Sequence, residues 1–292
     1  MKKILLIAII LVTLFSFHTE ITAQPYNYEY VNVTTRANIT NAGPEVLSVL
    51  VDQDVTLNAG STKTVYCNAS IRDWNGWDDV VLVNATFFHQ TSSHESINNG
   101  SVHYTNASCE NTGNDGGFIT EYSCSFQVVH YALNGSWTCN VTAEDTFSFT
   151  DSLANTTSIN ELYALNVTDT IDYGDLAVTD TSADVPATIT NIGNMNINVS
   201  VLGYGLTQGD GWGLICEQGS NITVENQRFA IAPAVDWLSK TPLQETNQDM
   251  SITLNRRDDS APVTFVTYWQ LFVPPNPFGL CTGTIRFTAT AP

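Results

Sequence analysis

Acidic side chains at matching spacings are the residues of this chain best suited to chemistry. Asp73 follows Cys67 by six residues, and Asp145 follows Cys139 by six residues. If the two cysteines meet, these equal offsets bring both aspartates to one end of a domain. Carboxylate and amide oxygens are the ligands that Ca²⁺ prefers, and one ion takes about six to eight of them. The sequence thus predicts a candidate calcium site made of Asp73, Asn75, Asp78, Asp79 and Asp145.

A purely structural role for these residues is the alternative. Their spacing does not match an EF-hand loop, whose ligands recur within about 12 consecutive residues. Asp and Asn side chains also accept hydrogen bonds from backbone amides in turns. In that case Asp73 and Asn75 cap a turn, and the other carboxylates are solvated.

Three loop tryptophans form a second group of candidates. Trp74 and Trp77 flank the acidic loop, and Trp212 lies in the stretch Gly-Asp-Gly-Trp-Gly. Tryptophans exposed on loops stack on sugar rings, which would make the chain a secreted glycan-binding module. Alternatively, Trp77 and Trp212 cover the ends of sheets, because aromatic rings bury large apolar areas.

Motifs for catalysis are missing from the sequence. It contains no Gly-x-Ser-x-Gly, no His-Glu-x-x-His and no P-loop pattern. His89, His94 and His103 cluster in an expected hairpin with residues 89 and 103 opposite each other, and surface histidines are favoured there over a zinc site. We expect a protein that is not an enzyme, with a hydrolase as the less favoured alternative.

Two segments of alternating polarity position the candidate residues. In residues 64–73 and 136–145, apolar side chains occupy every second position, which indicates half-buried strands. Cys67 and Cys139 fall on the apolar faces, so both point into a core and can join two sheets, as in an immunoglobulin-like sandwich. The two bridged strands of such a sandwich run in the same direction.

The six cysteines indicate an oxidising compartment. All lie after residue 60, their number is even, and none forms a Cys-x-x-Cys pair. The expected disulfides are Cys67–Cys139, Cys109–Cys124 across a hairpin with the tip Asn-Asp-Gly-Gly, and Cys216–Cys281 mostly by elimination. Four cysteines in one domain allow three connectivities, so the first two pairs are a preference.

The N-terminus predicts export. Lys2 and Lys3 precede an apolar run from Ile4 to Phe17, and Ile21-Thr22-Ala23 resembles a signal-peptidase site. We expect residues 1–23 to be a cleaved signal peptide, with an uncleaved anchor as the alternative. No later run reaches the length of a membrane span, so we expect the mature chain to have none.

Composition excludes some partners and favours glycosylation. The net charge is −19, which repels nucleic acid and anionic lipid. Twelve Asn-x-Ser/Thr sequons occur, several of them on the polar face of an expected strand, and they predict dense N-glycosylation. They lie at Asn32, Asn38, Asn68, Asn84, Asn99, Asn106, Asn134, Asn140, Asn155, Asn166, Asn198 and Asn221.

The predicted fold class is all-β, with two consecutive immunoglobulin-like sandwich domains after the signal peptide. Residues 24–43 are expected as an extended N-terminal arm or a first strand, 44–160 as a sandwich with two disulfides, and 161–292 as a second, adhesion-type sandwich with one disulfide. Residues 151–160 are polar and small, as in a linker or a crossing strand. Residues 187–201 alternate about Asn-Ile-Gly-Asn, which predicts a hairpin or a bulged strand.

Several short motifs resemble known cell-surface modules. Asp-Trp-Asn-Gly at 73–76, Cys-Ser-Phe at 124–126 and Gly-Ser-Trp-Thr-Cys-Asn-Val-Thr at 135–142 resemble immunoglobulin-like modules of archaeal cell-surface proteins. Ile-Thr-Asn-Ile-Gly-Asn at 189–194 and the final Cys-Thr-Gly-Thr-Ile-Arg-Phe-Thr-Ala strand look like adhesion-type sandwich domains.

This resemblance implies an extracellular structural or adhesive role in an envelope, filament or adhesin. It also implies partners among other cell-surface proteins, copies of the same chain or glycans, and it carries over no catalytic residues. One departure concerns the position two residues before the second bridging cysteine. Related sandwiches often have Tyr there, and this chain has Trp137, which puts the usual corner hydrogen bond in doubt.

Overall fold

The computed structural model describes residues 29, 31–258 and 261–292. The expected signal peptide, residues 1–23, and residues 24–28 of the expected arm lie outside this range. Two units are distinguished, Met1–Thr40 and Asn41–Pro292. Within the described part of the first unit, no residue belongs to a strand and every side chain is exposed, so the alternative of a first strand over these residues is wrong.

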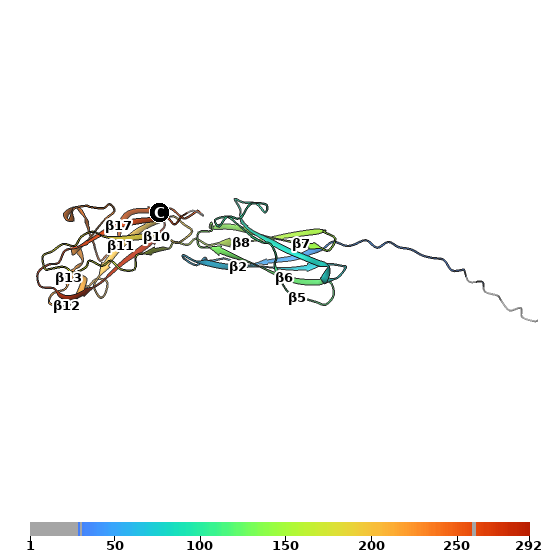
Figure 1. Cartoon of the computed structure of the whole chain (residues 1–292), viewed down its shortest axis with the longest axis horizontal. Coiled ribbons are helices and arrows are strands. Elements are labelled where there is room, and N and C mark those ends of the chain that lie inside the picture. The colour runs from blue at the N-terminus through green and yellow to red at the C-terminus, as the bar shows by residue number, and fades with distance from the viewer. Residues whose placement is uncertain (1–28, 30, 259–260) are drawn as a thin grey trace, which may run out of the picture. The chain divides into compact units, whose positions relative to one another are not determined.

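The second unit confirms the all-β class: its only helical elements among the described residues are three short 3₁₀ turns, η1 (Trp77–Asp79), η2 (Val224–Asn226) and η3 (Trp237–Ser239). We call strands β1 to β8 the first sandwich. One of its sheets has the order β1 (Glu45–Val51), β2 (Thr62–Arg72), β6 (Ile119–Val129) and β5 (Glu110–Asn114). The other has the order β4 (His103–Asn106), β3 (Val80–His89), β7 (Gly135–Asp145) and β8 (Thr150–Ile159). Figure 1 shows β2, β5 and β6 in one layer, with β7 and β8 in the other.

Apolar side chains from both sheets form the core of the first sandwich. Trp137 is fully buried, and its ring stacks on Phe87 with centroids 4.8 Å apart. Its indole N–H donates a 2.7 Å hydrogen bond to the carbonyl oxygen of Leu133. This bond reaches back to the backbone a few residues upstream, as the tyrosine hydroxyl does in related sandwiches. The indole therefore takes over the role of the corner hydrogen bond.

All three expected disulfides are present. Cys67 on β2 is bonded to Cys139 on β7, so this bridge joins the two sheets of the first sandwich. Cys109 is bonded to Cys124 beside the β5–β6 hairpin. Cys216 on β12 and Cys281 on β18 lie directly opposite each other in register and are also bonded.

We call strands β9 to β19 the second sandwich. One sheet has the order β15 (Thr241–Pro242), β14 (Gln227–Ala230), β17 (Thr264–Leu271), β10 (Val185–Asn191) and β9 (Leu165–Val167). A second consists of β16 (Gln248–Leu254), β11 (Ile197–Tyr204) and β19 (Thr284–Thr290), and a third of β13 (Ile222–Thr223), β12 (Trp212–Gln218) and β18 (Phe278–Thr282). Trp269 is fully buried in this core and contacts Phe229 and Phe287.

The structure corrects two local expectations. Of the two alternatives for residues 151–160, the linker is wrong, because nearly all of these residues belong to the strand β8, which pairs along almost the whole of β7. Residues 187–201 form no hairpin, because β10 and β11 belong to different sheets. The turn between them is held by the buried Asn191, whose Nδ2 donates to the backbone oxygens of Met195, Leu254 and Asn255. A side chain that binds three carbonyls turns the chain from one sheet to the other.

The structure contradicts the expected pairing of His89 with His103 and the expected exposure of these two side chains. Phe88, not His89, pairs with His103 across β3 and β4. His89 and His103 are only 4 % and 1 % exposed, so they are no surface histidines. Burial lowers the pKa of both imidazoles, because the charged form loses its hydration.

Candidate functional site

The candidate site lies where three strands of the first sandwich begin or end. Asp73 follows the last residue of β2, Asp79 ends η1 just before β3, and Asp145 is the last residue of β7. The Cys67–Cys139 bridge joins β2 and β7, and Asp145 pairs with Val80 at the start of β3. These three connections hold the aspartates at one end of the sandwich.

One carboxylate oxygen from each of Asp73, Asp79 and Asp145 lies within 4.8 Å of those of the other two. The residues Asp73 and Asp145 are 0 % and 1 % exposed, so the carboxylates are largely removed from solvent. We call this group the acidic cluster. Three carboxylates at this distance repel one another strongly, since little water screens them.

One oxygen of each carboxylate is held in place by a hydrogen bond. Oδ1 of Asp73 accepts from the amide of Asn75 at 2.8 Å, and Oδ1 of Asp79 accepts from the hydroxyl of Thr146. Oδ1 of Asp145 accepts from the backbone amides of Phe147 and Phe149, at 2.9 and 2.8 Å. These bonds orient the carboxylates, so the cluster is built into the loops around it.

The second oxygens of two of these carboxylates are unpaired. Among the described residues, the buried Oδ2 atoms of Asp73 and Asp79 have no hydrogen-bond partner. The pKa of Asp73 is raised, first by burial and further by the charges of Asp79 and Asp145. Buried polar atoms in native proteins nearly always bond to protein, to ordered water or to a ligand, so these two oxygens are open to a ligand.

Asn41 also lies at this site, although no sequence motif pointed to it. Its Nδ2 donates a 2.6 Å hydrogen bond to Oδ2 of Asp145, 104 residues further along the chain. Its Oδ1 is buried and, within the described part of the chain, unpaired. No motif or periodicity relates the two positions, so only the fold could reveal this contact.

The two other residues of the expected calcium site are not in the acidic cluster. Oδ1 of Asn75 accepts a 2.9 Å hydrogen bond from the amide of Ala42 and thus holds the incoming segment against the loop. Asp78 is exposed, and its carboxylate lies beside Gly76. A Cβ at position 76 would come within 2.7 Å of Oδ1 of Asp78. The backbone φ of Gly76, +134°, also favours glycine.

The three tryptophans differ in exposure. Trp74 is 58 % exposed and packs beside Phe118, with ring centroids 5.4 Å apart, and under the guanidinium of Arg72. Trp77 and Trp212 are half-buried at loops, which agrees better with the alternative that they cover the ends of sheets. Glycan binding stays a prediction, and of the three residues only Trp74 is exposed.

Asp210 organises the loop that carries Trp212. Its Oδ2 accepts from the amides of Leu206 and Thr207 at 2.7 and 3.0 Å, and its Oδ1 accepts from the amide of Trp212 at 3.0 Å. These amides stabilise the ionised carboxylate and lower its pKa to about 2.

The substitution Asp210→Ala should therefore release this loop. We expect the amides of Leu206, Thr207 and Trp212 to exchange hydrogen much faster in the variant at neutral pH, while the β17 amides are unchanged. Because the pKa of Asp210 is lowered in the folded state, its stabilising effect is present above a pH of about 4 and is lost as the pH falls towards about 2. Equal exchange rates in both proteins at pH 7 would contradict this role.

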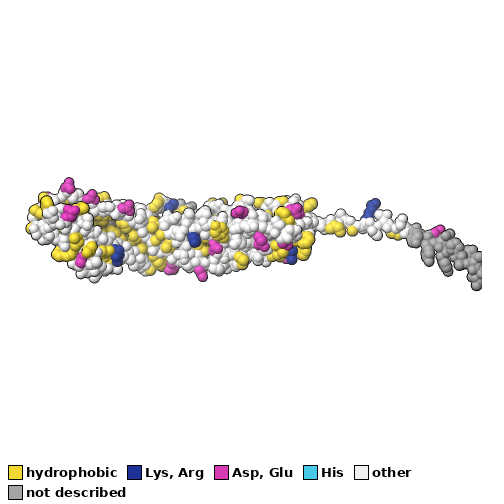
Figure 2. Space-filling model, turned by 90° about the horizontal axis from the view of Figure 1, so that it is seen from below, with side chains coloured by type: hydrophobic (Ala, Val, Ile, Leu, Met, Phe, Trp, Pro, Cys, Tyr) yellow, Lys and Arg dark blue, Asp and Glu magenta, His cyan; other side chains and the backbone are white. Residues whose placement is uncertain are grey.

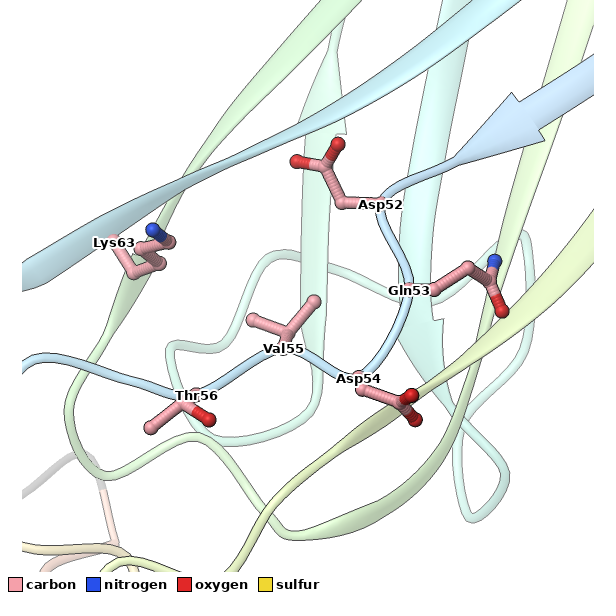
Figure 3. Close-up of a pocket in the computed structure, with 6 residues that line it drawn as sticks. All are labelled: Asp52, Gln53, Asp54, Val55, Thr56 and Lys63. Carbon is pink, nitrogen blue, oxygen red and sulfur yellow. The ribbon is translucent and has the colours of Figure 1, made fainter.

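The first sandwich also has a shallow depression, at the segment after β1. It is lined by Asp52, Gln53, Asp54, Val55, Thr56 and Lys63 (Figure 3). Two of its carboxylates serve the fold, since Asp52 accepts from the amide of Tyr66 at 2.9 Å and Asp54 from the hydroxyl of Ser158 at 3.1 Å. The residues around it form no arrangement of nucleophile, base and oxyanion donors.

The surface is mostly polar and uncharged. On the face shown in Figure 2, acidic side chains are scattered singly over a largely white surface, with few basic ones. Each of the twelve sequon asparagines is exposed or half-buried, so their side chains are reachable from solvent. Among the residues described, no helix is both long and apolar enough to cross a membrane.

Comparisons with known proteins identify neighbours by shape only. No protein-family profile and no curated protein sequence matches the chain. A chaperone–tip adhesion subunit complex, CsuC–CsuE of Acinetobacter baumannii Csu pili, is similar in structure with 11 % identity, a TM-score of 0.38 and coverage of 83 % of this chain and 99 % of that one. The CupB6 tip adhesin of Pseudomonas aeruginosa has 12 % identity, a TM-score of 0.28 and coverage of 85 % and 94 %.

A tandem pair of titin immunoglobulin domains is also similar, with 12 % identity, a TM-score of 0.26 and coverage of 85 % and 96 %. These neighbours are adhesins and immunoglobulin-like proteins. Likenesses this distant carry no argument about the function of this chain.

Proposed function

We propose that this chain is an extracellular, N-glycosylated, non-catalytic protein that serves as a structural or adhesive component of a cell surface. Its partners are other cell-surface proteins or copies of itself. Three disulfides in the second unit support an oxidising, extracellular environment. The twelve accessible sequons support glycans on the outward faces, where they would keep strand edges from aggregating.

The observation that carries the interfacial role is the pattern of residues 31–40. Val31, Val33 and Ile39 are 83 %, 80 % and 86 % exposed, and no strand in the described part of the chain pairs with this segment. All three are at odd positions, so in an extended chain they lie on one face. The sequon residues Asn32 and Asn38 fall on the opposite face. A strand with one apolar and one glycosylated face is suited to pairing with an exposed sheet edge of another molecule.

Deleting residues 24–40 of the secreted chain is expected to abolish self-assembly or partner binding. The reason is that the exposed apolar face and the unpaired backbone amides of this segment supply the interaction. The measurement is electron microscopy of purified protein and of cell envelopes, together with light scattering of the purified chain. Filaments, lattices or stable oligomers of the full-length protein should be replaced by monomers.

Substitutions within the arm test whether assembly depends on its apolar face or only on its length. The triple variant Val31→Asp, Val33→Asp and Ile39→Asp should behave like the deletion. The matched control Asn32→Asp, Arg36→Asp and Asn38→Asp adds as many aspartates to the opposite face and should still assemble. Assembly that is unchanged by the deletion would count against this role of the arm.

A further inference from the structure

Three side chains at the end of the first sandwich present buried oxygens that have no hydrogen-bond partner among the described residues. Asp73, Asp79 and Asn41 each have one buried, unpaired oxygen among the described residues, and Asp145 completes the acidic cluster. The ion pairs Arg72–Glu45 and Lys240–Asp184 do not involve these carboxylates. The site combines three carboxylates with an amide oxygen, and no ion pair from a described residue to these carboxylates is seen.

A proton shared between two carboxylates would stabilise the acidic cluster less than a metal ion would. One proton serves one acceptor, so two of the three unpaired oxygens would stay unsatisfied and would each still carry a desolvation cost. A divalent cation takes several oxygen ligands at once and offsets most of the charge. The geometry suits an ion as well, because the oxygens of the cluster converge within 4.8 Å of one another.

The distances and ligand types fit calcium. Ca²⁺–O distances of about 2.3–2.6 Å place opposite ligands of one ion roughly 4.6–5.2 Å apart, whereas Mg²⁺ at about 2.0–2.1 Å would draw them to about 4.2 Å. Ca²⁺ also accepts amide oxygens and irregular geometry, and water completes its shell. Oxygens spread over up to 4.8 Å need little movement to bind Ca²⁺.

We propose that Asn41, Asp73, Asp79 and Asp145 bind one Ca²⁺ ion, and that this ion fixes the segment 41–43 to the end of the first sandwich. The segment already has contacts there. The amide of Ala42 donates to Oδ1 of Asn75, and a Cβ on Gly43 would lie 3.1 Å from Cβ of Phe149. Asn41, Ala42 and Gly43 all belong to the unit Asn41–Pro292, as do the three aspartates.

The first test is binding to the secreted, full-length chain after removal of metal with a chelator. Titration calorimetry with CaCl₂ should show one site, with a Kd on the order of 10⁻⁴–10⁻³ M, as in other extracellular calcium modules. Adding 10 mM Ca²⁺ should raise the Tm of the first sandwich by about 3–10 °C. Hydrogen exchange at residues 41–44 should slow at the same time, while MgCl₂ has a much smaller effect.

Variants that remove one negative charge show whether Asp73 binds a metal ion or serves only to stabilise the fold. In EDTA, Asp73→Asn should melt at or above the wild-type temperature, because it relieves repulsion in the acidic cluster. In 10 mM Ca²⁺ it should melt below wild type, because its own Ca²⁺-dependent rise is lost. The control Asp78→Asn removes an exposed carboxylate from the same turn and should keep the full rise.

Asn41→Ala tests the amide ligand, and it also removes the hydrogen bond from Asn41 to Asp145. It should weaken Ca²⁺ binding several-fold and remove the Ca²⁺-dependent protection at residues 41–44. The proposal is overturned if calorimetry detects no binding up to 10 mM Ca²⁺, if Mg²⁺ has the same effect as Ca²⁺, or if Asp73→Asn keeps the full Tm rise. None of these outcomes depends on whether the chain assembles through its arm.

Discussion

Replacing Cys67 and Cys139 together by alanine is expected to lower the free energy of unfolding of the first sandwich by about 4 kcal/mol. The bridge closes a loop of 72 residues, so its loss gives the unfolded chain much more conformational freedom. Both cysteines are fully buried between the sheets, so the folded state loses packing as well. The measurement is equilibrium unfolding in guanidinium chloride, followed by circular dichroism.

The other disulfide of the first sandwich provides the matched control. Cys109 and Cys124 are only 15 residues apart, so their joint replacement by alanine should cost about 3 kcal/mol, less than the first pair. Only the first double variant should also loosen the geometry of the acidic cluster, because it removes the covalent link between β2 and β7, the strands next to Asp73 and Asp145. A smaller loss from the Cys67/Cys139 variant than from the control would contradict the central role of that bridge.

The second large effect is expected at the ion pair between Lys240 and Asp184. Nζ of Lys240 lies 2.8 Å from a carboxylate oxygen of Asp184, and the two side chains are 0 % and 23 % exposed. Replacing Asp184 by alanine leaves a buried ammonium group without a counter-charge. We expect this to destabilise the second sandwich by about 3 kcal/mol or more. Denaturant unfolding of the variant measures the loss.

A double-mutant cycle shows how much of this loss comes from the unpaired charge. Lys240→Met alone keeps the apolar stem and removes the charge, and it should cost less than Asp184→Ala. In the double variant, most of the loss caused by Asp184→Ala should disappear, because no buried charge remains. Strictly additive losses would mean that the two side chains do not interact.

Period-two alternation around Cys67 and Cys139 was enough to predict the main features of the first sandwich. It indicated that both sulfur atoms point inwards and can join two sheets, and the structure contains this bond. The equal offsets of Asp73 and Asp145 from the two cysteines then followed from strand geometry, which has a fixed rise per residue. The structure places these aspartates together.

Other features depend on contacts that no local pattern encodes. The alternation in residues 187–201 is the same whether two strands pair with each other or face each other across a core. The buried Asn191 lies at the end of β10, and its Nδ2 donates to the nearby carbonyl of Met195 and to the distant carbonyls of Leu254 and Asn255. The register of β3 and β4 differs by one residue from the expected one, so His103 pairs with Phe88 rather than with His89. Register depends on packing on both faces of the sheet, which the local pattern does not encode.

The sequence by itself determined the all-β class, the inward direction of Cys67 and Cys139 and the acidic character of one end of the first sandwich. These follow from side-chain periodicity and from fixed offsets along single strands. Only the tertiary structure decided which acids converge, leaving Asp78 in solvent and adding Asn41. The physical reason is that a ligand cluster is set by how loops from distant parts of the chain close over a sheet end, and loop closure has no periodic signature.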